Sequence, residues 1–229
     1  MMETFSNHKI ACMQPYLFPY LGYFQLINSV DDFIILDDVG YFKKGWLHRN
    51  QILVNNQPFL FTIPLHKASQ NRTIRQHEIQ NNWSDKFLVT LRHAYSKSPY
   101  FENSWDFIKS LVLSTHEKNI AEAGLHILKQ ISVRLDLQSN FMLSSEIDTG
   151  DKTKQDRIIA LCKSRNALTY INPIGGKEIG MYHKKDFDPI VLKFIERKDN
   201  EGFYSIIHYL FTKSKDEIRN ILNQYELID

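Results

Sequence analysis

The sequence predicts an α/β fold, with a mostly parallel Rossmann-like sheet covered by helices, a small β insertion and a helical middle region. Short apolar runs of the kind that form buried strands alternate with segments whose apolar residues recur at helical spacing. The first unit combines an apolar run at 9–13, a helical pattern at 20–27 and a second apolar run at 33–36. A strand, a helix and a strand in this order form a right-handed βαβ unit, whose parallel strands end at the same edge of the sheet.

Composition indicates one globular unit. The chain of 229 residues is 43% hydrophobic and 24% charged, so it is long enough to bury one substantial core. No repeat, low-complexity linker or long run of one charge marks a boundary, and residues 1–229 are expected to form a single domain. The net charge of +2 gives no reason to expect a polyanionic partner. No apolar run approaches the roughly 18 residues that span a bilayer, and "MMETFSNHKI" lacks the apolar centre of a secretory signal, so we expect a cytoplasmic protein without membrane insertion.

The remaining segments complete the expected fold in chain order. Three extended segments, divided by breaks that contain Asn, Pro or Ser, predict the β insertion: 49–54, 58–65 and 72–79. Apolar residues then step by four from Trp83, and three helices are expected: 83–95, 105–118 and 120–137. A second α/β unit consists of a strand, a helix, and a strand that runs into a glycine-rich loop: 140–147, 154–167 and 168–178. A last strand is expected at 190–197, and Ser214 with Glu217 forms a capping box at the start of a final helix.

The first candidate site is the turn "QPYLFPYLGYF" at 14–24, directly after the first strand. Its prolines fix φ and remove backbone donors, which makes the turn stiff, and Gly22 allows the following helix to approach its neighbours closely. A rigid connection with aromatic packing is one explanation. A ligand platform better explains an amide and several tyrosine hydroxyls, which need partners when buried. The predicted substrate-binding residues here are Gln14, Tyr16, Tyr20, Gly22 and Tyr23.

The second candidate site is "ILDDVGYFKKGWLHRNQI", which begins in the second strand. Asp37 and Asp38 could bind a sugar hydroxyl, accept a proton from an amine or hold a metal, whereas pairing with a nearby lysine or arginine is the structural alternative. His48 is the histidine expected to act as a general base, because its neighbours are polar and its reference pKa lies near neutrality. Stacking, phosphate binding and hydrogen bonding are expected from the residues around it: Trp46, Arg49 and Asn50.

The third candidate site is the glycine-rich "NPIGGKE" at 172–178. The backbone N–H groups of Gly175 and Gly176, with Lys177 beside them, could surround an anion, although the motif matches neither the P-loop nor the dinucleotide fingerprint and a flexible turn explains it as well. This loop and the aromatic turn both follow strands, and ligands of parallel sheets bind at the carboxyl ends of strands, so one shared site is expected. The other histidines lack metal-ligand spacing, and Cys12 and Cys162 read as reduced, buried thiols. We therefore expect no metal and no cofactor.

Together these motifs resemble the WbqC-like family of bacterial proteins. The similar segments are "MQPYLFPYLGYF", "DDFIILDDVGYFKKGWLHRNQI", "LFTIPL", "AYSKSPYF" and "LTYINPIGGKE". They extend from Lys9 to Lys177, whereas the C-terminal part departs from the family pattern. Members are typically encoded among genes for O-antigen lipopolysaccharide and other surface polysaccharides, so the resemblance implies a role in the biosynthesis of such a polymer.

The activity that the resemblance implies is transfer of an acyl or aminoacyl group, such as glycine, to the amino group of a nucleotide-linked amino sugar, with a dTDP-linked sugar as one candidate. Asp38, Asp37 or His48 would accept the ammonium proton, because only a neutral amine attacks an acyl carbon. An aminoacyl-tRNA donor would be the one nucleic-acid partner, and a homo-oligomer is a candidate state. The alternatives are an ATP-dependent ligase or nucleotidyltransferase of the same pathway and a non-catalytic nucleotide-sugar-binding partner.

Overall fold

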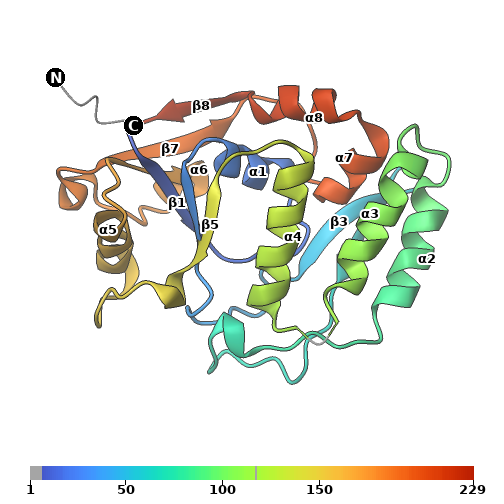
Figure 1. The fold of residues 1–229 in the computed structure, drawn as a ribbon, viewed down its shortest axis with the longest axis horizontal. Helices are drawn as coiled ribbons and strands as arrows, with labels where there is room; N and C mark the ends of the chain where they lie inside the picture. Colours follow the sequence, from blue (N-terminus) through green and yellow to red (C-terminus); the bar gives the residue numbers. More distant parts are fainter. Residues whose placement is uncertain (1–6, 117) are drawn as a thin grey trace.

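The computed structural model describes residues 7–116 and 118–229 (Figure 1). Its main sheet has six strands in the order β5-β2-β1-β6-β7-β8, all parallel except β8, which is antiparallel to β7. These strands are β1 (Lys9–Met13), β2 (Asp32–Ile35), β5 (Asn140–Leu143), β6 (Thr169–Pro173), β7 (Val191–Arg197) and β8 (Tyr225–Ile228). A separate antiparallel hairpin consists of β3 (Arg49–Val54) and β4 (Gln57–Thr62). The α/β fold with its mostly parallel sheet and small β insertion is confirmed.

Helices cover the sheet and form the middle region of the chain. The middle region holds α2 (Ser84–Tyr95), α3 (Phe101–Leu113) and α4 (Ile120–Arg134), and Figure 1 shows α2 and α3 on the same side of the molecule as β3. The other helices are α1 (Leu21–Asn28), α5 (Lys154–Ser164), α6 (Ile174–Glu178), α7 (Ile206–Thr212) and α8 (Lys215–Leu222). No helix in the described residues is long and apolar enough to cross a membrane.

The strand order places a ligand-binding position beside β1, in the middle of the sheet. The chain adds β2 and then β5 on one side of β1, and β6 and then β7 on the other side. Cys12 pairs with Ile34 on the first side and Lys9 pairs with Thr169 on the second. The order therefore reverses between β1 and β6, and open α/β sheets bind ligands beyond the carboxyl ends of the strands at such a switch point.

Alternate side chains of the central strands pack on opposite faces of the sheet. In β1, Ala11 belongs to the larger core, which includes residues of α1 and α4, whereas Ile10 and Cys12 belong to the smaller core with α5. Cys12 and Cys162 are both buried and free, as expected. Burial raises the pKa of the Cys12 thiol well above its ordinary value and that of Cys162 to about 12, so neither is a thiolate at neutral pH.

Four expected elements differ from the structure. Residues 72–79, expected to be extended, contain a single 3₁₀ turn (Ile74–Gln76), because Thr73 and Gln76 close a capping box around it. The glycine-rich segment after β6 is the short helix α6 and not a loop. The second of the three expected helices, 105–118, begins earlier than expected, at Phe101, and the strand expected at 140–147 ends at Leu143. Helix α7 and strand β8 were not predicted, whereas the Ser214–Glu217 capping box at α8 is confirmed.

Candidate functional site

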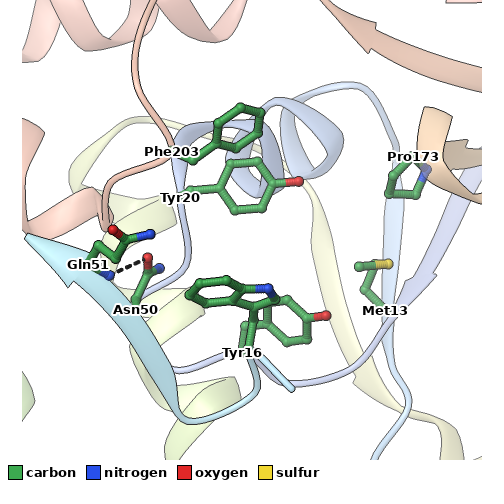
Figure 2. A pocket seen from close by; sticks show the side chains of 8 residues that line it. Met13, Tyr16, Tyr20, Asn50, Gln51, Pro173 and Phe203 are labelled. Atoms are coloured by element: carbon green, nitrogen blue, oxygen red, sulfur yellow. Dashed lines mark hydrogen bonds between the residues drawn. The ribbon is translucent and has the colours of Figure 1, made fainter. Parts of the chain in front are cut away.

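A pocket of about 390 Å³ lies at the switch point of the sheet, beyond the carboxyl ends of β1 and β6 (Figure 2). Four aromatic side chains, two amides, a thioether and a proline line it: Tyr16, Tyr20, Trp46, Phe203, Asn50, Gln51, Met13 and Pro173. None of these side chains is an acid, a lysine, an arginine or a histidine. The pocket thus presents ring faces with a few neutral hydrogen-bonding groups.

Contacts with the β3 segment hold the aromatic turn in place. The Leu17 N–H donates to Leu47 O at 2.8 Å, and Asn50 Nδ2 donates to Phe18 O at 2.9 Å. Leu17 and Phe18 are fully buried, so the turn is anchored by its apolar residues and by these two hydrogen bonds. The segment "WLHRN" therefore lies directly against the turn.

Tyr16 and Tyr20 present their hydroxyls on the side of the pocket where Met13 and Pro173 lie (Figure 2). Burial raises the pKa of both phenols, so both are neutral and able to donate a hydrogen bond at neutral pH. The Tyr20 ring also packs against Phe203, with 5.6 Å between ring centroids. These rings form walls against which the flat face of a sugar or a base can stack.

The other predicted residues of the turn support the pocket from behind. Tyr23 is buried, and its hydroxyl donates to Gln14 O at 2.6 Å. Gly22 lies in the first turn of α1, where an added Cβ would come within 2.5 Å of Tyr20 Cε2. Gly22 is therefore required for the Tyr20 ring to pack against α1, and Gln14, Gly22 and Tyr23 are not among the residues that line the pocket.

His48 is enclosed by protein partners. Its Nδ1 lies 2.6 Å from Ile63 O and its Nε2 lies 3.0 Å from the Tyr41 hydroxyl, so both ring nitrogens are engaged. Burial lowers the pKa of this imidazole and keeps it neutral at neutral pH. The structure places His48 outside the pocket lining, although its neighbours Trp46 and Asn50 are part of that lining.

Arg49 holds the loop that carries Trp46. Its Nε donates to Gly45 O at 3.1 Å, and Nη2 donates to Lys44 O. The guanidinium carbon lies 5.8 Å from the centroid of the Trp46 ring. Arg49 thus contacts the pocket through the tryptophan that it supports.

Asp37 is an internal anchor between β2 and the segment after β5. Its side chain is 1% exposed and accepts hydrogen bonds from the Ser144 hydroxyl at 3.1 Å, the Ser145 N–H at 3.0 Å and the Ser145 hydroxyl at 2.7 Å. A buried carboxylate is stable only with such partners. The structure therefore engages Asp37 in joining two strand ends.

Asp38 lies in a different groove from the aromatic pocket. This open groove of about 670 Å³ is bordered by Asp38, Arg157 and the segment 144–153. Asp38 accepts hydrogen bonds from Arg157 Nη2 and the Ser144 hydroxyl, both at 2.6 Å. Burial raises the pKa of Asp38, but these hydrogen bonds outweigh that effect and hold the pKa below its ordinary value. The structure does not bring Asp37, Asp38 and His48 to one surface of the aromatic pocket.

The glycine-rich segment contributes to the site mainly through its first residues. Pro173 lines the pocket, whereas Gly175, Gly176 and Lys177 lie in α6 and are not part of the lining. An added Cβ on Gly176 would come within 2.0 Å of Asn172 Nδ2, so this glycine permits close packing at the end of β6. Lys177 Nζ donates to Asp229 O at 2.5 Å.

Four lining residues were not predicted: Met13, Gln51, Pro173 and Phe203. Gln51 and Pro173 lie inside quoted motifs and Met13 directly precedes one, so their places inside β3 and at the ends of β6 and β1 were available signals. Phe203 has no local signal, because long-range backbone bonds bring it to the pocket. The Ser205 N–H donates to Gln51 O at 2.7 Å, and the following N–H donates to Pro19 O.

No group of three or more His, Cys, Asp or Glu side chains in the residues that the structure describes could hold a metal ion. The lining side chains of the pocket offer ring stacking and neutral hydrogen bonds to a ligand.

Comparison with known proteins gives a family for the chain. The sequence matches the WbqC-like protein family over residues 14–219. This match continues past α7 and into α8. The family resemblance therefore extends further toward the C-terminus than Lys177, where the quoted motifs end. A similar protein is "Uncharacterized protein Rv1507c" of Mycobacterium tuberculosis, 28% identical over 166 residues, which are 72% of this chain and 71% of that protein. No solved structure was found to match the chain. The chain belongs to the WbqC-like protein family.

Proposed function

We propose that this protein is a transferase that places an acyl or aminoacyl group, such as glycine, on the amino group of a nucleotide-linked amino sugar during synthesis of O-antigen or another surface polysaccharide. The observation that carries this proposal is the aromatic pocket at the switch point of the sheet. A volume of about 390 Å³ lies in the range of small-molecule sites and is large enough for a sugar or a base. The family assignment supports a polysaccharide pathway.

The composition of the lining fits a neutral ring better than a phosphate. Rings of Tyr20 and Trp46 can stack against the apolar face of a sugar or against a base. The tyrosine hydroxyls and the amides of Asn50 and Gln51 can bond to ring substituents. Because no lining side chain is cationic, the diphosphate of a nucleotide sugar would lie at the mouth of the pocket.

A second candidate function is favoured by the internal partners of the predicted bases. Asp37 and His48 are both satisfied by protein groups, as expected for a non-catalytic nucleotide-sugar-binding protein. Asp38 lines an open groove and is the predicted base with the greater access to a ligand. The two functions differ in whether a product forms after binding.

The proposal is tested first by binding of a nucleotide-linked sugar and then by formation of a product from it. We expect a dTDP-linked amino sugar to raise the melting temperature of the protein, and Trp46→Ala to abolish that shift. Phe59→Ala is a matched control, because Phe59 is a half-exposed ring on β4 that does not line the pocket. Failure of every nucleotide-linked sugar to bind would refute the proposal.

Mass spectrometry then separates the two candidate functions. Incubation with the amino sugar and an acyl or aminoacyl donor should add the mass of the acyl group to the sugar. Binding without any product from any donor would favour the non-catalytic function, whereas a product that requires ATP and magnesium would indicate a ligase. Asp38→Asn, Asp37→Asn and His48→Ala, assayed in folded protein, should differ in kcat if one of them is the base.

A further inference from the structure

The aromatic pocket could in principle select either of two charge states of an amine. Faces of Tyr, Trp and Phe rings carry negative partial charge and attract ammonium groups, as in aromatic cages. Burial, in contrast, disfavours a charged group that has no partner. The groups around the rings therefore decide which form of an amine the pocket admits.

Two guanidinium groups already lie against three of the four rings. Arg197 Cζ lies 4.7 Å from the centroid of the Phe203 ring and 5.7 Å from that of Tyr20. Arg49 Cζ lies 5.8 Å from the centroid of Trp46. A cationic ligand between these rings would meet like charge in a partly desolvated site, which raises the free energy of the bound cation.

Arg197 is held in a fixed position. Its Nε donates to Asp199 Oδ2 at 3.0 Å, Nη2 donates to Asp199 Oδ1, and Nη2 also donates to Glu201 O at 3.0 Å. Gln25 Nε2 holds the same carboxylate at 2.8 Å. The side chain passes so close to α1 that a Cβ on Gly22 would lie 2.8 Å from Arg197 Cδ. Asp199 balances the formal charge, but the guanidinium is the group that lies on the ring faces.

The other ionisable groups around the pocket do not supply a partner for an ammonium group. The eight lining residues include no carboxylate, and the titratable ones, Tyr16 and Tyr20, are neutral at neutral pH. Asp199 is engaged by Arg197, and Glu201 pairs with Lys213 at 3.0 Å. Among the residues that the structure describes, no carboxylate lines the pocket, and the nearby Asp199 and Glu201 each have a cationic partner.

We propose that Arg197 and Arg49 make the aromatic pocket exclude cationic groups, so that an amino sugar places its amine there as the free base. The identity of the ligand rests on the proposed function. Binding would release one proton from the sugar ammonium group to the solvent, and the nitrogen lone pair would be ready to attack an acyl carbon. The pocket itself would then prepare the nucleophile by desolvation.

The first experiment is calorimetric titration with a dTDP-linked amino sugar and with its counterpart that carries a hydroxyl in place of the amine, from about pH 6 to pH 9. At pH values below the pKa of the amine, we expect the Kd of the amino sugar to fall about tenfold for each unit by which the pH is raised. The reason is that the neutral fraction of the amine rises by that factor. The Kd of the hydroxyl sugar should stay constant. Buffers of different ionisation enthalpy should report release of a proton on amine binding at low pH.

The second experiment uses the tetramethylammonium ion, a permanent cation, as the probe, and the readout is the change in tryptophan fluorescence, to which Trp46 in the pocket lining contributes. Wild type should bind it weakly, whereas Arg49→Met and the double variant Arg197→Met with Asp199→Asn should bind it at least about tenfold more tightly than wild type does. The double variant avoids an unpaired buried carboxylate. Arg92→Met is the control, because Arg92 lies over the Trp105 ring at 4.8 Å and not at the pocket.

The outcomes separate this inference from the proposed function. A Kd for the amino sugar that is independent of pH, or equal binding of tetramethylammonium by wild type and both variants, would overturn the inference. If neither sugar binds while the probe gains affinity in the variants, the selectivity stands and the proposed substrate is wrong. Should the double variant unfold, Arg49→Met alone decides the probe experiment, because its guanidinium bonds only to loop carbonyls in the described contacts.

Discussion

Replacement of Asp37 by asparagine should lower the folding stability of the protein, because Asp37 is a buried structural anchor. The carboxylate accepts three hydrogen bonds from Ser144 and Ser145 at 2.7–3.1 Å and is 1% exposed. A hydrogen bond to a charged group contributes about 1 kcal/mol more than a neutral one, so three weakened bonds cost about 3 kcal/mol. Removal of a buried charge offsets part of this loss, which leaves about 2 kcal/mol. For a chain of this size, the melting temperature should fall by about 4–8 °C.

The assay is thermal and urea unfolding followed by circular dichroism. Asp106→Asn makes the same chemical change at an exposed position on α3 and should leave the melting temperature nearly unchanged. The loss of melting temperature for Asp38→Asn should lie between those of the other two variants, because the Asp38 side chain is partly exposed to water in an open groove. A melting temperature of Asp37→Asn within about 1 °C of wild type would contradict the assignment of Asp37 as an anchor.

Three further predictions test other parts of the fold. Gly124→Ala should destabilise the protein by about 1–3 kcal/mol in urea unfolding, despite the better helix propensity of alanine, because its Cβ would lie 2.8 Å from Pro15 O; a more stable variant would contradict this packing. The low folded-state pKa of Asp38 gives stability that is present above about pH 4 and is lost as the pH falls through the folded value. The difference in unfolding free energy between wild type and Arg157→Met should therefore shrink on acidification, and a constant difference would argue against the pair. Ser214→Ala should cost about 0.5–2 kcal/mol through loss of the capping box at α8, and no change would show that the cap is dispensable.

Local patterns predicted most of the elements because each is dominated by near neighbours in the sequence. β1 and β3 have the expected bounds, and the capping box at Ser214 was visible from two side chains. Residues 72–79 look extended in composition, but a capping box at Thr73 closes a tight turn instead. Helix α7 was missed because its residues are nearly all apolar, so no amphipathic period marks them.

The candidate site was predictable only in part. Tyr16, Tyr20, Trp46 and Asn50 were predicted as ligand-binding residues of two motifs, and they share the lining of one pocket. Neighbouring residues in the same motifs have other surroundings: His48 bonds to Ile63 O and to a tyrosine hydroxyl. Which side chain of a motif faces the cavity depends on the direction of each Cα–Cβ bond, and small shifts in a loop change that direction.

The sequence by itself determined the fold class, the position of the aromatic turn after the first strand and the family resemblance, because these depend on residue type and order. Only the tertiary structure decided the composition of the site. It separated Asp37 and Asp38 from the aromatic pocket, since both bond to Ser144 on the far side of β2. It also brought Phe203 and Arg197 to Tyr20 across the sheet. Contacts between residues so distant in the chain arise from packing of whole elements, which no local pattern specifies.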